Sequence, residues 1–218
     1  MLKLPRMHGS WSIWLISTSF AFLIARSFDP LIFLVVALFL FSVEPAYGLI
    51  SERKVDRSLL IPAVFTLSLM IIAVTNKSVI PFILVYSLIL ALQIKFKDNL
   101  GAFTGIGSIV MTFPFPLITA YFSIDFFTTL RALIFLVLVV LFSYSLVLYR
   151  NKNKKTLALT FLTLLLIYSF SPTIAYGLFL IATALLFLAV KRISLKGVGK
   201  SLLTYQFFSI LIYQFLFL

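Results

Sequence analysis

Apolar residues fill most of the chain in nine runs, and short polar segments separate each run from the next. Runs near the roughly 20 residues that cross a bilayer as a helix are typical of membrane-spanning segments. The pattern predicts an all-α integral membrane protein with about nine transmembrane helices, and we expect residues 1–218 to form a single transmembrane helical domain. The runs are 11–25, 31–50, 59–75, 79–94, 100–122, 126–149, 156–170, 173–190 and 201–218.

The polar segments alternate in charge, and this alternation predicts an orientation. Fifteen of the eighteen Lys and Arg residues fall on the side that holds the N-terminus, and the other three are Arg26, Lys77 and Arg131. Lysine and arginine collect in cytoplasmic loops, so we expect the N-terminus in the cytoplasm and, after nine spans, Leu218 outside.

Composition agrees with a membrane protein. Hydrophobic residues make up 62% of the chain and charged residues only 11%, with a mean hydropathy of +1.17, whereas a soluble domain is about a quarter charged. The net charge of +12 would suggest nucleic acid in a soluble protein. Here basic loops are better explained by orientation and by anionic lipid head groups, so we expect membrane lipids and no nucleic acid as partners.

The first run follows Lys3 and Arg6 and could be read as a secretory signal. Arg26 stands where a cleavage site would need a small residue, and Trp11 and Trp14 occupy positions typical of interfacial anchors. We therefore expect this run to be retained as the first helix.

Glu44 is the one carboxylate well inside a run. A charge within the membrane is costly and is rarely kept without a partner, which makes Glu44 the leading polar candidate. Pro45 follows it directly and leaves an alternative, in which the second helix ends at Pro45 and Glu44 lies among the head groups.

The fifth run combines glycines and prolines. Gly101 and Gly105 are one helical turn apart, which favours close helix packing over a phosphate-binding loop, because such a loop would follow a strand. Pro114 and Pro116 should bend or interrupt the helix, and an interrupted membrane helix needs protein or a wet cavity around it.

The residues that are rare exclude several kinds of chemistry. The chain has no cysteine, one histidine and six carboxylates, so thiol catalysis, zinc sites and iron–sulfur clusters lack ligands. Haem held by His8 and a methionine stays formally open, but His8 is better explained as a hydrogen-bonding residue at the membrane boundary. We expect no cofactor, no metal site and no catalytic residue.

The opening Pro5-x-x-His8-Gly9-x-Trp11 resembles the N-terminal motif of the YwiC-like family of multi-pass membrane proteins. Later segments at 97–102, 149–150 and 196–199 are also similar to that family. The resemblance implies a membrane protein and brings no established activity with it.

The nine-helix topology also resembles the UbiA-type intramembrane prenyltransferases. That resemblance implies a similar bundle, with two acidic clusters that hold Mg²⁺ against a diphosphate. Here the first region has Glu44, Glu52 and Asp56 in a different spacing, and residues 150–155 have no acid. A degenerate UbiA-like prenyltransferase is therefore one alternative.

These observations lead to one candidate site at the cytoplasmic face. We expect it to bind an amphipathic ligand with an anionic head, such as a lipid or isoprenoid phosphate, because interfacial cations there accompany polar groups embedded in helices. An accessory or assembly subunit of a larger membrane complex is the other alternative, and an enzyme is less expected than either. The candidate ligand-binding residues are His8, Trp11, Glu44, Arg53, Asp98, Asn99 and Arg150.

Overall fold

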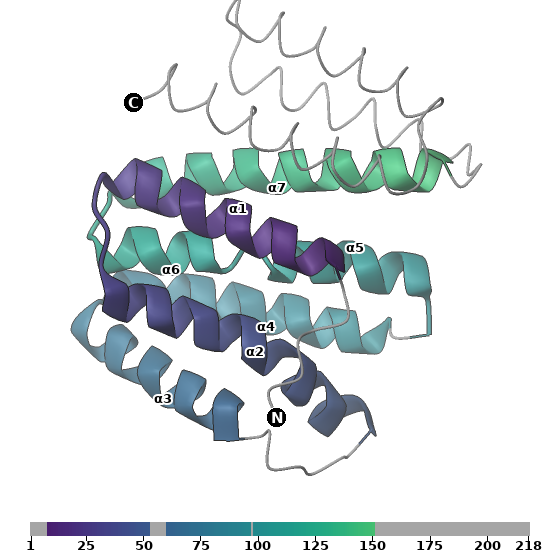
Figure 1. The fold of residues 1–218 in the computed structure, drawn as a ribbon, viewed down its shortest axis with the longest axis horizontal. Coiled ribbons are helices and arrows are strands. Elements are labelled where there is room, and N and C mark those ends of the chain that lie inside the picture. The colour runs from purple at the N-terminus through teal and green to yellow at the C-terminus, as the bar shows by residue number, and fades with distance from the viewer. Residues whose placement is uncertain (1–7, 53–59, 97, 151–218) are drawn as a thin grey trace, which may run out of the picture. The chain divides into compact units, whose positions relative to one another are not determined.

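The computed structural model describes residues 8–52, 60–96 and 98–150, and within these ranges it contains helices and turns but no strand. This confirms the all-α class for the described part. The helices are α1 (His8–Ala25), α2 (Pro30–Glu52), α3 (Leu60–Thr75), the 3-10 turn η2 (Lys77–Val79), α4 (Ile80–Lys95), α5 (Leu100–Val110), α6 (Pro114–Tyr121) and α7 (Phe126–Arg150) (Figure 1).

The first six apolar runs each correspond to helices of the structure. The first four match α1 to α4, the fifth is divided between α5 and α6, and the sixth matches α7. The three remaining runs lie outside the described residues. The chain divides into two compact units, Met1–Leu133 and Ile134–Leu218, with the boundary inside α7, and the expected single domain stays a prediction.

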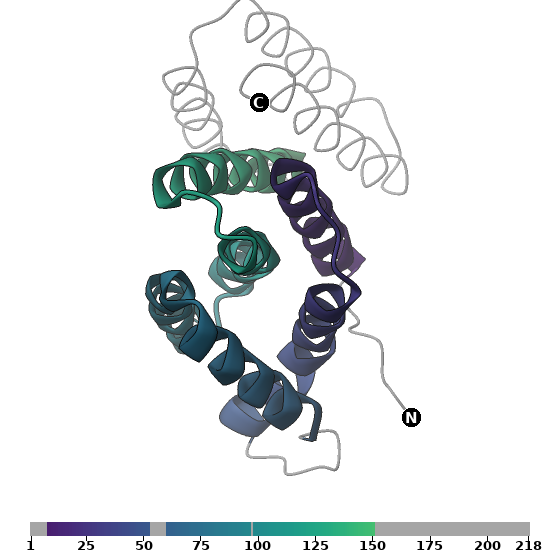
Figure 2. The same ribbon diagram turned by 90° about the vertical axis from the view of Figure 1, so that its left-hand side faces the viewer.

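The helices of the first unit pack chiefly in three pairs. α2 packs on α3, α4 on α5 and α1 on α6, and α6 also contacts α2 and η2. Figure 2 shows the α5–α6 segment in teal with α1, α2, α3 and α4 arranged around it. The interrupted segment is thus the central element of this unit.

α2 continues through Pro45 to Glu52. The alternative in which the second helix ends at Pro45 is therefore wrong. Proline removes one backbone donor, but the helix can continue where neighbouring groups satisfy the freed carbonyl. Glu44 consequently lies eight positions before the last helical residue, about 12 Å along the axis.

The fifth run is interrupted, as its prolines predicted. α5 ends at Val110, a turn occupies residues 111–113, and α6 begins at Pro114. A proline at the start of a helix loses no intrahelical bond, which is why α6 can begin there. All residues from Val110 to Ala120 are buried, so protein surrounds the interruption.

The core of the first unit is apolar and rich in aromatic side chains. Phe20 and Phe115 are fully buried and their ring centroids are 5.1 Å apart, which joins α1 to α6. Phe113 lies 5.4 Å from Phe39 of α2 and 4.9 Å from Tyr86 of α4, between ring centroids. These contacts centre the core on the α5–α6 segment.

Among the helical stretches whose side chains are described throughout, one is both long and apolar enough to cross a bilayer. It is Lys77–Lys95, with 19 residues and a mean hydropathy of 1.9. Only 22% of its most apolar stretch is buried inside the protein, so most of this apolar helix faces outward.

Candidate functional site

The predicted cytoplasmic residues belong to helix ends that the first unit brings to one side. His8 begins α1, Trp11 follows in its first turn, and Asp98 and Asn99 form the turn between α4 and α5. Figure 1 shows the start of α1, the end of α2 and the α4–α5 turn at the same end of the helices. The backbone therefore gathers four of the seven candidates near the end of the helix that holds Glu44.

The last two of the seven candidates, Arg53 and Arg150, do not belong to this group. Arg53 lies outside the described residues, and Arg150 is the last residue of α7, in the second unit. The structure therefore does not join either residue to the other five.

The α4–α5 turn presents its polar residues to the surroundings. Lys95, Asp98 and Asn99 are exposed. The backbone N–H of Asn99 donates to the carbonyl of Phe96 over 2.9 Å, and the carbonyl of Asn99 accepts from Phe103 N–H over 2.8 Å. Backbone hydrogen bonds thus help to hold this exposed turn.

Metal binding has no framework in the described residues. Among the side chains that the structure describes, no three His, Asp or Glu residues lie close enough together to hold an ion. Asp56, part of the first acidic region, lies outside these ranges. The side chains of Glu44 and Glu52 are not described either, so the degenerate UbiA-like alternative stays a prediction.

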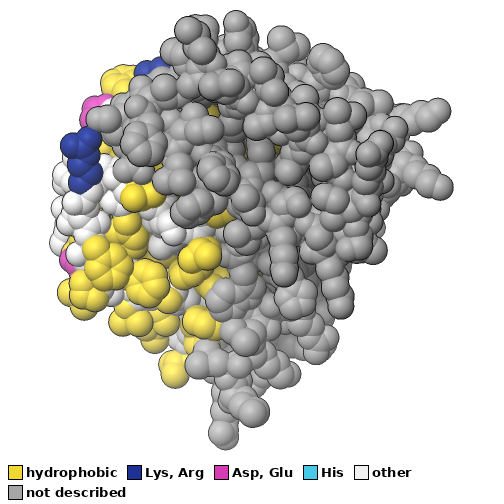
Figure 3. Space-filling model, turned by 45° about the horizontal axis from the view of Figure 1, so that its top comes forward, with side chains coloured by type: hydrophobic (Ala, Val, Ile, Leu, Met, Phe, Trp, Pro, Cys, Tyr) yellow, Lys and Arg dark blue, Asp and Glu magenta, His cyan; other side chains and the backbone are white. Residues whose placement is uncertain are grey.

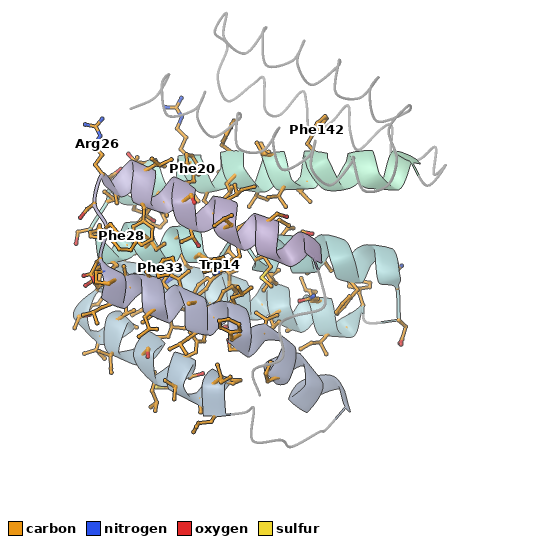
Figure 4. All side chains as sticks on the ribbon, in the orientation of Figure 1. Trp14, Phe20, Arg26, Phe28, Phe33 and Phe142 are labelled. Carbon is orange, nitrogen blue, oxygen red and sulfur yellow. The ribbon has the colours of Figure 1, made fainter. Side chains whose placement is uncertain are left out.

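Trp14 is not an interfacial anchor. Its side chain is only 7% exposed, and its indole N–H donates to the carbonyl of Val36 in α2 over 3.0 Å. Its ring centroid lies 6.2 Å from that of Phe33, and Figure 4 shows both side chains between α1 and α2. The expected role of Trp14 at the lipid–water boundary is therefore wrong, because the indole satisfies its donor inside the bundle.

The sequence prediction missed a group of buried hydroxyls at the interruption. Ser17 Oγ donates to the carbonyl of Met111 over 3.1 Å and shares that donor with the carbonyl of Trp14 at 3.0 Å. Tyr86 Oη lies 2.5 Å from Thr112 Oγ1. Thr112 Oγ1 in turn donates to the carbonyl of Ile109 over 2.7 Å, so Tyr86 is the donor to Thr112. The signal for this group in the sequence was the presence of isolated Ser, Thr and Tyr residues within apolar runs.

Gly107 of α5 packs closely against a side chain of α4, whereas the close packing expected at Gly101 and Gly105 stays a prediction. A Cβ on Gly107 would lie 2.5 Å from Nε2 of Gln93 on α4. Gln93 is buried, and its Nε2 donates weakly to the carbonyl of Phe103 over 3.4 Å. Gly107 thus leaves room for an amide that links α4 to α5.

At the opposite end of the first unit, Asp29 joins two helices. Its Oδ1 accepts from the N–H of Leu31 over 2.7 Å, which caps α2, and its Oδ2 accepts from the hydroxyl of Tyr121 over 2.6 Å. The Tyr121 hydroxyl, followed by the Leu31 N–H, lowers the pKa of the Asp29 carboxyl below its ordinary value.

The end of α6 is held from a second side. The side-chain N–H of Asn76 donates to the carbonyl of Ala120, while its Oδ1 accepts from Ser78 N–H over 3.0 Å and caps η2. Ser123 then ends the helix in the left-handed region, with φ 56° and N–H groups of Ser123 and Ile124 bonded back to α6. The outer end of α6 is therefore fixed.

Arg26 and Arg131 were expected near the outer boundary, and both are exposed. Figure 4 shows Arg26 extending away from the helices. A cluster of rings accompanies this end: the centroid of Phe22 lies 4.9 Å from Phe28 and 6.3 Å from Phe122. Arg26 and a group of aromatic rings thus lie near the turn between α1 and α2.

Comparison with known proteins agrees with the opening motif. Residues 4–99 match the family described as YwiC-like protein. An uncharacterized protein of the archaeon Archaeoglobus fulgidus is 37% identical over 117 residues, which are 54% of this chain and 50% of that protein. The chain thus spans about half the length of this curated relative. No solved structure matches the chain. The resemblance indicated by Pro5, His8, Gly9 and Trp11 is thus confirmed as a match to the YwiC-like family over residues 4–99.

Proposed function

We propose that this chain is a multi-pass membrane protein of the cell membrane, with its N-terminus in the cytoplasm, that binds an amphipathic ligand with an anionic head at its cytoplasmic end. The ligand class is a lipid or isoprenoid phosphate. The exposed apolar surface of α3 and α4 is the observation that carries the membrane assignment, and the helix ends gathered near Glu44 support the ligand site.

Large apolar side chains are exposed at several positions along both α3 and α4. Ile72 is the buried residue of α3, while Leu67, Ile71 and Val74 are 61%, 66% and 80% exposed. A helix in water would place polar residues on such a face. Figure 3 shows hydrophobic side chains gathered in a broad patch on the described part of its face. Lipid acyl chains account for this surface.

Helix length supports the same assignment. α2 has 23 residues and α7 has 25, which correspond to about 34 and 37 Å at 1.5 Å per residue. The hydrocarbon core is about 30 Å thick. α5 and α6 together, with the turn between them, cover the 22 residues 100–121, so the interrupted segment can also serve as one span.

The charges favour a cytoplasmic N-terminus. Arg26, Lys77 and Arg131 belong to the turns and helix starts at the end that holds Asp29, whereas Lys95 lies at the opposite end of α4. The other basic clusters fall on the side of Lys95 in the nine-span arrangement.

An anionic head group suits the chemistry of the cytoplasmic end. Phosphate is recognised by cations and by N–H donors, and a carboxylate such as Glu44 can order a neighbouring cation or hydroxyl. The basic residues also attract anionic lipid by about 1 kcal/mol each near a negative leaflet.

Native mass spectrometry of the protein extracted gently from its own membrane tests the ligand site. We expect a lipid-sized adduct on the wild-type chain that is lost in Glu44→Ala. Asp125→Ala is the matched control, because it removes a carboxylate from the α7 cap at the other end of the unit. A bare wild-type chain would contradict the ligand site, as would an adduct unaffected by Glu44→Ala. Recovery in a stoichiometric complex with another membrane protein would replace the ligand site with the accessory-subunit function.

A further inference from the structure

The interruption between α5 and α6 marks a change of packing partner. α5 packs mainly on α4, whereas α6 packs mainly on α1 and also contacts α2 and η2. A helix that packs on one neighbour along its whole length can be continuous. A span that packs first on one helix and then on another has to change direction between them, and three non-helical residues give it that freedom. Residues 111–113 supply that freedom.

Two prolines prevent residues 111–113 from joining α5 and α6 into one continuous helix. Pro114 and Pro116 have no N–H to give to the carbonyls of Val110 and Thr112. Those carbonyls instead accept from Phe113 N–H over 3.1 Å and from Phe115 N–H over 3.0 Å. Because the tighter i to i+3 bonds satisfy the turn, it can stay open in the protein interior without unpaired carbonyls.

The two sides of the turn are held to different degrees. α6 is buried from Pro114 to Ala120, and Asn76 and Asp29 hold its outer end through Ala120 and Tyr121. In α5, Phe103, Gly105 and Val110 are buried, but residues 106–109 are only partly buried, and the Gln93 contact to Phe103 is long at 3.4 Å. The outer half-helix is therefore the fixed side.

Ser17 connects α1 to the turn itself. Its hydroxyl donates to Met111, the first residue after α5, and Ser17 and Met111 are 0% and 3% exposed. A hydrogen bond at the pivot can hold one tilt of α5 over another, because the direction of the Met111 carbonyl changes with the turn.

We propose that residues 111–113 form a hinge at which α5 tilts relative to the fixed half-helix α6, and that the Ser17–Met111 hydrogen bond favours the closed arrangement. The tilt moves the α4–α5 turn relative to the start of α1 and so opens and closes the cytoplasmic end. The hinge thus regulates the proposed ligand site, and this regulatory role rests on the proposed function.

Distances between paired spin labels test the hinge, and the chain's lack of cysteine makes the labelling specific. Leu15→Cys with Asp98→Cys spans α1 and the start of α5, and Leu15→Cys with Lys77→Cys spans α1 and the fixed outer end. All three positions are exposed. α5 has 11 residues and is about 17 Å long, so a 10° tilt moves its start by about 3 Å. In ligand-free lipid nanodiscs we expect two distances or a broad range for the first pair, and one narrow distance for the second.

Two sets of variants connect the motion to the hinge. Pro114→Ala with Pro116→Ala lets a regular helix form, and should narrow the first distance. Ser17→Ala should shift the population of the first pair toward the longer distance by about three- to tenfold, as expected for one hydrogen bond. Thr18→Val is the matched control, because the Thr18 hydroxyl is buried without a partner.

A single narrow distance for the first pair, unchanged by Ser17→Ala, would overturn the hinge even if the proline variants fail to fold. Equal shifts in Ser17→Ala and Thr18→Val would overturn the role of the Ser17 hydrogen bond. No ligand is present, so these results are independent of the adduct experiment. A hinge in a protein that carries no adduct would leave the motion standing and remove the proposed ligand site.

Discussion

The Met111 carbonyl lies where α5 has ended and α6 has not begun, and the Ser17 hydroxyl donates to it over 3.1 Å. Ser17→Ala would leave this carbonyl without that donor inside an apolar bundle. We expect the variant to lose about 1 kcal/mol of unfolding free energy, the usual scale of a side-chain hydrogen bond between membrane helices. Reversible unfolding in mixed micelles measures the loss.

Thr18→Val is the comparison at the neighbouring position. The Thr18 hydroxyl is buried and has no hydrogen-bond partner, so its removal should leave stability unchanged or raise it. A loss in Thr18→Val as large as the loss in Ser17→Ala would contradict the importance of the Met111 contact.

The contact between Gly107 and Gln93 leads to a second prediction about stability. A methyl group at Gly107 would meet Nε2 of Gln93 at 2.5 Å, so Gly107→Ala must displace the Gln93 amide and its bond to Phe103. We expect a cost of about 1 kcal/mol in the wild-type background. Most of that cost should disappear in a Gln93→Ala background, which a double-mutant cycle of unfolding free energies measures. Equal costs in both backgrounds would show that the contact is not the cause.

Asp29 predicts a dependence of stability on pH. Its pKa is lowered in the folded protein by the Tyr121 hydroxyl and the Leu31 N–H, from an ordinary value of 3.8. A lowered pKa stabilises the fold above 3.8, and this stabilisation is lost as the pH falls through the folded-state pKa. The difference in melting temperature between wild type and Tyr121→Phe should therefore be constant above about pH 5 and shrink below about pH 4. A difference that does not change between these values would contradict the charge-assisted bond.

The exposure or burial of individual side chains was only partly predictable from the sequence. The exposure of Arg26 and Arg131 followed from their places near the ends of runs. The burial of Trp14 did not, because an indole near a helix start can satisfy its N–H at the membrane surface or on a neighbouring helix. The choice depends on the position of Val36, which is 22 residues away in the chain.

At the scale of helices, proline has two different effects on helix continuity. Pro114 and Pro116 interrupt the fifth run, whereas Pro45 lies inside a continuous α2. Two prolines spaced by one residue remove two backbone donors within one turn, and Thr112 and Phe113 adopt the turn that this favours. A single proline removes one donor, so the helix continues. Sequence alone gives the position of a proline but not the neighbours that decide its effect.

α3 provides the prediction at this scale. Leu67 is in the middle of α3 and 61% exposed, and Thr75 is exposed at its end. If lipid covers α3, Leu67→Lys should cost about 3 kcal/mol in insertion, while Thr75→Lys should cost little because its ammonium reaches the interface. The yield of each variant in the membrane fraction, with its melting temperature in micelles, measures the difference. Equal tolerance of the two lysines would indicate that α3 faces water.

For the whole molecule, the spacing of apolar runs predicted α1 to α4, the divided α5–α6 segment and α7. The pairing of helices was not predictable, because the apolar faces of these helices carry few features that select one neighbour over another. α6 packs on α1, which precedes it by nearly 90 residues. The candidate site was predicted as a polar cluster at the cytoplasmic face. The helix ends that bear His8, Trp11, Asp98 and Asn99 lie at one end of the first unit, and the site itself stays a prediction.

Membrane orientation is the central claim, and two single-cysteine variants test it directly in the cysteine-free chain. Lys77→Cys and Lys95→Cys lie at opposite ends of the Lys77–Lys95 helical stretch, and both positions are exposed. A membrane-impermeant maleimide applied to intact cells should label Lys77→Cys at once, and should label Lys95→Cys only after the membrane is permeabilised. Labelling of both variants in intact cells, the reverse order, or recovery of the protein in the soluble fraction would contradict the account.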